Sequence, residues 1–125
     1  MPPYARAVFI NCPFSPDYRP IFRAILFAVY RCRYQPRCAL EVADASENRL
    51  AKIERIIRQC KFGIHDISFM ELDPATHLPR FNMPFELGVF LAAKSFGTEQ
   101  RRKKIALIFD STGYRYRDSL SDISG

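Results

Sequence analysis

Glu86 is the acidic residue whose neighbours point most clearly to chemistry. It stands between Phe85 and Leu87 and is followed by Gly88. A carboxyl group among apolar neighbours can have a raised pKa, or can be directed at a cationic centre. A plain structural role competes with this interpretation, because the helix dipole favours acids in the first turn of a helix. Glu86 is therefore our catalytic candidate, and helix stabilisation is the alternative.

Asp66 is a second acidic candidate, close to the end of an otherwise apolar run. His65 precedes it, and alternation along a strand puts the two side chains on opposite faces. Asp66 is suited to cap the following loop or to accept a hydrogen bond from a ribose hydroxyl, and capping is the favoured interpretation. His65 is more typical of a core or interface histidine than of a catalyst.

The histidines and cysteines form no recognised metal-binding pattern. His77 falls in a long loop, far from His65. The cysteines have no Cys-x-x-Cys spacing: they are Cys12, Cys32, Cys38 and Cys60. We therefore expect neither a metal site nor a bound cofactor. Cys32 and Cys60 fall on apolar helix faces, which predicts that both are core thiols.

Four apolar, β-rich runs alternate with three helical patterns along the chain. The predicted strands are residues 7–10, 39–42, 62–67 and 105–109. The first helix is predicted with Pro20 in its first turn and an apolar stripe of Ile21, Ile25, Val29 and Cys32.

The second and third helices are marked by capping residues. Asp44 or Ser46 is predicted as the N-cap of the second helix, whose stripe is Leu50, Ile53, Ile57 and Cys60. Asn82 is predicted to cap the third helix, which ends near Gly97. Its inward face is expected to consist of Phe85, Val89, Ala92 and Ala93.

This alternation predicts a three-layer α/β, flavodoxin-like fold. A parallel sheet of about four to five strands, in the order 2-1-3-4(-5), would carry helices on both faces. We expect one domain over residues 1–125, either cut from a longer protein or with a degenerate edge.

The predicted topology places a site before any motif is considered. Ligands of such sheets bind beyond the carboxyl ends of the strands, where the strand order reverses. The polar residues and loops at that rim are Asn11, Cys12, Pro13, Asp44, Asp66, Ser68, Asp110 and the segment 80–86. Arg19, Arg37 and Arg80 are candidates to meet phosphates near it.

The amino-acid composition indicates the charge of the binding partners but not their class. The formal charge of +6 favours anionic partners without choosing among them. Nucleic acid is not favoured, because residues 101–104 are predicted to lie at the opposite edge of the sheet and residues 114–117 offer only a minimal basic and aromatic pattern. No apolar run approaches the roughly 20 residues of a membrane span, and the N-terminus does not resemble a signal peptide. We expect a cytoplasmic protein that does not bind membranes.

Two short motifs resemble those of nucleoside 2-deoxyribosyltransferases. The segment 7–14, Ala-Val-Phe-Ile-Asn-Cys-Pro-Phe, is similar to their first strand and loop, and Phe85-Glu86-Leu87-Gly88 is similar to the start of the helix that carries their catalytic glutamate. TIR and TIR-like domains, which belong to the wider kinship, place a glutamate comparably on a flavodoxin-like sheet. The likeness follows most of the chain in element order and is specific at these two motifs.

The resemblance implies cleavage of a base–sugar bond. Glu86 would act as nucleophile or stabiliser at the anomeric carbon, since an oxocarbenium-like centre needs a carboxylate beside it. Asn11 and Pro13 would shape the pocket floor, and Asp66 would orient the sugar. Arg80 departs from the pattern, because the transferases have an acidic residue six positions before their glutamate. An arginine there suits a phosphorylated ligand.

Two hypotheses of different classes follow. The first is an N-glycosidase or nucleoside-handling TIR-like domain acting on NAD or a nucleoside, with a site formed by Glu86 and the substrate-binding candidates Asn11, Pro13, Asp66, Ser68, Arg80 and Asn82. The second is a non-catalytic TIR-like module that senses a nucleotide or assembles as a homo-oligomer in signalling or defence.

Overall fold

The computed structural model describes residues 2–41, 44–68, 74–77 and 81–110. Its core is a parallel sheet in the order β2-β1-β3-β4, built from β1 (Ala7–Asn11), β2 (Gln35–Arg37), β3 (Phe62–Asp66) and β4 (Ile105–Phe109). The predicted strand order and the flavodoxin-like α/β class are confirmed. Among the described residues, no helix is both long and apolar enough to cross a lipid bilayer.

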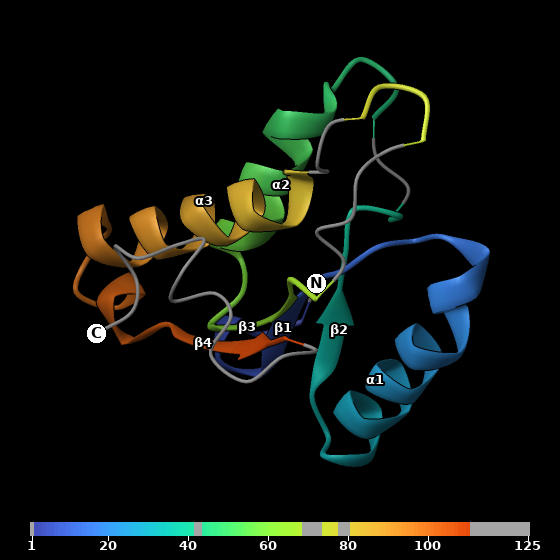
Figure 1. The fold of residues 1–125 in the computed structure, drawn as a ribbon. Helices are drawn as coiled ribbons and strands as arrows, with labels where there is room; N and C mark the ends of the chain where they lie inside the picture. The colour runs from blue at the N-terminus through green and yellow to red at the C-terminus, as the bar shows by residue number, and fades with distance from the viewer. Residues whose placement is uncertain (1, 42–43, 69–73, 78–80, 111–125) are drawn as a thin grey trace.

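Helices cover both faces of the sheet. Helix α1 (Arg19–Arg31) lies on one side, and α2 (Arg49–Arg58) and α3 (Asn82–Phe96) lie on the other (Figure 1). Strand β1 is buried throughout, and its side chains alternate between the layers. Ala7 and Phe9 pack toward α2 and α3, whereas Val8 and Ile10 pack toward α1.

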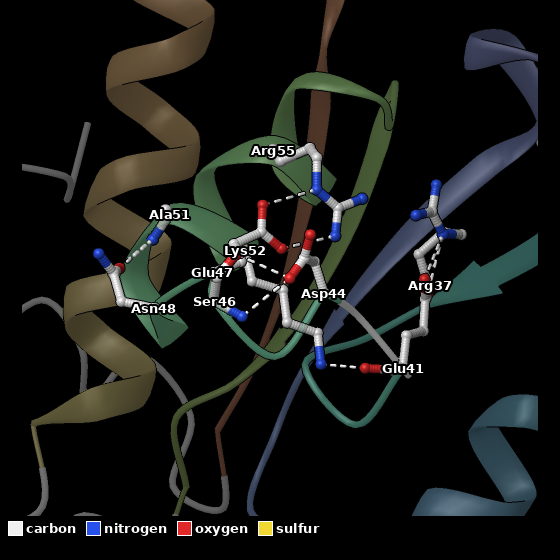
Figure 2. A network of polar contacts seen from close by, with 9 residues as sticks. All are labelled: Arg37, Glu41, Asp44, Ser46, Glu47, Asn48, Ala51, Lys52 and Arg55. Atoms are coloured by element: carbon white, nitrogen blue, oxygen red, sulfur yellow. Dashed lines mark hydrogen bonds and ion pairs between the residues drawn. The ribbon is translucent and has the colours of Figure 1, made fainter.

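The second strand lies upstream of the prediction. Residues 39–42 were predicted as the strand, but β2 is Gln35–Arg37 and the chain turns directly after it. Glu41 causes this turn, because its carboxylate accepts from Arg37 Nε at 2.8 Å and from Cys38 N at 3.0 Å. Figure 2 shows how the loop is tied to α2: Lys52 Nζ donates to Glu41 O, and Arg55 forms an ion pair with Glu47 at 3.0 Å. Arg37 is thus buried and paired, not free at a site rim.

The predicted caps of α2 and α3 are wrong by a few residues. Asn48 caps α2 by accepting a 2.8 Å hydrogen bond from Ala51 N, whereas Asp44 accepts from Ser46 within the preceding turn (Figure 2). Asn82 is the first residue of α3, and no side chain caps that helix. Gly97 ends α3 as predicted.

The buried face of α3 also differs from the prediction. Met83, Glu86, Leu87 and Phe90 are buried, whereas Phe85 is 55% exposed and Ala92 is exposed. Val89 and Ala93 are partly buried beside the core that includes α2. The helix therefore turns a carboxyl group inward, which an apolar pattern alone does not predict.

Two cysteines and one lysine show further where the sequence prediction holds and where it fails. Cys60 is a core thiol as predicted, but Cys32 is exposed at the C-terminal end of α1. Lys104, the last residue of the basic run, is fully buried; its Nζ donates to Cys60 O and, at 2.6 Å, to Ile57 O, so it closes the C-terminal end of α2.

Candidate active site

The candidate site lies at the carboxyl ends of the two central strands. Strand order reverses between β1 and β3, and these strands end at Asn11 and Asp66. The N-terminal part of α3 crosses the same edge, because Asn11 Nδ2 donates to Met83 O at 2.7 Å. This contact fixes the helix that carries Glu86.

Asn11 is a positioning residue in this arrangement. Its side chain is buried, and Nδ2 also lies 2.9 Å from His65 Nδ1. Since the amide nitrogen can only donate, Nδ1 accepts and the imidazole proton sits on Nε2. Asn11 Oδ1 is buried and has no hydrogen-bond partner among the described residues.

His65 belongs to the core and does not face the site. It is fully buried, and its ring packs edge-on against Phe9 and Phe90. Burial lowers its pKa to about 3, so the ring is neutral at physiological pH. Gly63 makes room for it, because a Cβ there would lie 2.5 Å from Nε2.

Asp66 is held by three donors. Tyr18 Oη donates to Oδ2 at 2.5 Å, Ser68 N donates to Oδ1 at 2.9 Å, and the Ser68 hydroxyl also donates to Oδ1. The expected loop capping is therefore present. Burial, followed by the Asp66 contact, raises the pKa of Tyr18, so the phenol stays protonated. A carboxylate has about four acceptor positions, which leaves Asp66 capacity for one more donor.

Glu86 lies in the second turn of α3 and is only 7% exposed. The helix-dipole explanation applies to the first turn, so it does not account for this position. Burial raises the pKa of Glu86 to about 7, and the nearby positive charge of Arg49 opposes that rise. Glu86 is thus divided between its acid and carboxylate forms near neutral pH.

Cys12 connects the two acids. Burial, followed by the charges of Cys38, Asp66 and Glu86, raises the pKa of its thiol to about 12. Cys12 and the Asp66 side chain lie on the α1 side of the sheet, where Tyr18 donates to Asp66, whereas Glu86 lies on α3 on the other side. Both acids are close enough to Cys12 for their charges to act on its thiol. The thiol stays protonated, so it is a neutral wall of the site and not a nucleophile.

From the predicted set, Asn11, Asp66 and Ser68 thus lie at or just beyond the carboxyl ends of β1 and β3, and Glu86 lies on the helix whose first turn Asn11 contacts. Pro13 instead lines a neighbouring cavity beside α1, Asn82 is exposed, and Arg80 lies outside the described residues. The sequence placed Cys12 at the rim of the site without a role, and it did not single out Tyr18 or Arg49. Among the described residues, no three His, Cys, Asp or Glu side chains are grouped as a metal site.

Comparisons with protein-family models, with characterised proteins and with solved structures found no significant match. The geometry of the site must therefore support any functional assignment.

Proposed function

We propose that this protein is an N-glycosidase or glycosyl-transferring domain that cleaves the base–sugar bond of a nucleoside or nucleotide at Glu86. The observation that carries the proposal is the burial of Glu86 beside Cys12 at the strand-order reversal, with a pKa near 7. Carboxyl groups with such shifts are typical of acid, base or nucleophile roles.

The chemistry follows from a carboxylate in a poorly solvated place. One oxygen of ionised Glu86 bonds to the anomeric carbon as the C–N bond breaks. The electron pair of that bond leaves with the base, which takes up a proton from water. Water then attacks the same carbon and releases Glu86, or a second base does so in a transfer reaction. Burial makes ionised Glu86 more effective in stabilising the positive charge that develops on the sugar than it would be in water.

Asp66 would orient the sugar in this scheme. Tyr18 and Ser68 hold its carboxylate in one geometry, and its remaining acceptor position suits a ribose hydroxyl. Asn11 would act indirectly, by holding the first turn of α3.

The test is chromatographic detection of free base after incubation with NAD and with a nucleoside and nucleotide panel. We expect release by the wild type, and a loss of more than about 100-fold in Glu86→Gln. Glu99→Gln is the matched control, because Glu99 is exposed and lies beyond α3. Absence of base release by the wild type, or equal release by Glu86→Gln, would contradict the proposal.

A non-catalytic assembly module is the second candidate, and one observation favours it. The face of β4 turned away from α3 carries Ile105, Leu107 and Phe109, which are 49%, 55% and 42% exposed. Beside them, an apolar hollow of about 280 Å³ extends to Cys32, which follows the last residue of α1. Contiguous exposed apolar surface is typical of protein–protein contacts, and a second copy of this chain is the occupant that we would test.

A further inference from the structure

A second cavity adjoins the site on the α1 side. It has a volume of about 250 Å³ and lies between the loop after β1, the N-terminal half of α1 and the loop after β2. Its lining consists of Pro13, Phe14, Ser15, Arg19, Phe22, Arg23, Leu26 and Leu40. The chain passes directly from Cys12, beside the two acids, to Pro13, in this cavity wall.

Arg19 and Arg23 give this cavity its charge. They stand one helical turn apart on α1, and neither forms an ion pair with any described residue. Like charges at this spacing repel each other. Arg19 is also the first residue of α1, where the helix dipole disfavours a cation and no side chain caps the helix. A bound anion would relieve all three of these unfavourable features.

The rest of the wall is apolar and aromatic. Phe14 and Phe22 meet edge to face at 5.4 Å between ring centroids, and Leu26 and Leu40 complete that surface. Ser15 also lines the cavity, and a serine hydroxyl can donate a hydrogen bond. Two guanidinium groups, a hydroxyl and an apolar wall together fit a phosphate ester better than a free inorganic anion or a neutral sugar.

We propose that this cavity binds the phosphate of a 5′-phosphorylated nucleoside, so that the substrates of the Glu86 site are nucleotides and not free nucleosides. The inference rests on the proposed function for its placement of the sugar at Glu86. A phosphate monoester carries nearly two negative charges at neutral pH, which matches the two arginines.

Calorimetric titration tests the proposal with four nucleosides (adenosine, guanosine, cytidine and uridine), their 5′-monophosphates and inorganic phosphate. We expect at least one monophosphate to bind 10-fold or more tightly than its nucleoside and than inorganic phosphate. Arg23→Ala and the double variant Arg19→Ala/Arg23→Ala should remove that preference. Arg31→Ala is the matched control, because Arg31 is in the last turn of the same helix and outside the cavity lining, and it should keep the preference.

Three results would overturn the inference: no monophosphate binding more tightly than its nucleoside, an unchanged preference in the double variant, or an equal loss in Arg31→Ala. Circular dichroism checks that each variant is folded. Failure of the proposed glycosidase function can be distinguished from failure of phosphate binding, because Glu86→Gln leaves the phosphate contacts of the cavity intact. Arg23-dependent nucleotide binding without base release would support the cavity and contradict the chemistry, whereas base release without any phosphate preference would do the reverse.

Discussion

At the scale of single residues, ionisation of Glu86 lowers the stability of the folded chain. Its pKa rises from an ordinary value of 4.5 to about 7 in the folded chain, so between these values the folded state binds more protons than the unfolded state. The free energy of unfolding must therefore fall as pH rises through this window.

Glu86→Gln removes the contribution of Glu86 to the pH dependence of stability, and the glutamine side chain has nearly the same shape as glutamate. We expect the variant and the wild type to have similar stability at pH 4, where both side chains are neutral. At pH 8 the variant should be more stable, by on the order of 2 kcal/mol. Denaturant unfolding at the two pH values measures the difference, and a difference of equal size at both would show that Glu86 is not shifted. Glu99→Gln should follow the wild type.

The sequence indicates the acids of the site better than their partners. Glu86 and Asp66 were identified because acidic residues beside apolar runs are conspicuous. Tyr18 was missed because it ends a short 3-10 helix, Pro16–Tyr18, and lies 48 positions from Asp66. Only the packing of the β1–α1 connection brings the two side chains together. The inward direction of Glu86 likewise depends on which face of α3 meets the sheet, which an apolar pattern with a polar exception does not specify.

At the scale of elements, Asn11 links the first strand to the third helix. Asn11→Asp keeps the size of the side chain but places a carboxylate oxygen where Nδ2 now donates to Met83 O and His65 Nδ1. Met83 O cannot donate in return, and His65 can do so only by moving its proton from Nε2 to Nδ1. We therefore expect a loss of about 2 kcal/mol in stability, chiefly from the Met83 contact. Thermal unfolding at pH 7 measures it.

The same variant separates positioning from catalysis. Base release should fall in Asn11→Asp because α3 shifts, while the pH at which activity is half-maximal should also move, since Glu86 would change its surroundings. Unaltered stability in Asn11→Asp would mean that the Asn11 contact does not hold α3.

Element order was predictable and element ends were not. Continuous apolar runs are typical of strands in parallel sheets, which made β1 and β4 evident from the sequence pattern, although one face of β4 is exposed. Strand β2 was misplaced because Ala39 and Leu40 look like a strand, whereas Glu41 turns the chain through its contacts with Arg37 and Cys38. Such side-chain-to-backbone contacts leave little periodic signal.

At the scale of the whole molecule, the two faces of the sheet are covered unequally. Helix α1 packs against β1 and β2, so the α1-side face of β4 is exposed among the described residues. We expect concentration-dependent association through this face, and Leu107→Lys should abolish it because it places a charge at the centre of the contact.

Sedimentation velocity over a range of concentrations measures this effect. Leu107 is 55% exposed, so its replacement should change the unfolding temperature only slightly. Leu50→Lys is the control, because Leu50 is 44% exposed on α2, on the other side of the sheet, and it should associate like the wild type. A wild type that stays monomeric throughout would remove assembly through this face as a function.

The two edge strands of the described sheet differ in their capacity to pair with a further strand. Strand β2 is three residues long and has Pro36, which lacks an amide proton, at its centre. Strand β4 is five residues long and contains no proline. An incoming strand can therefore form backbone hydrogen bonds along β4, whereas β2 offers it very few. Edge-to-edge pairing of this described sheet would therefore join two copies at residues 105–109 and would stop at a pair, because the two outer β2 edges offer few hydrogen-bonding groups.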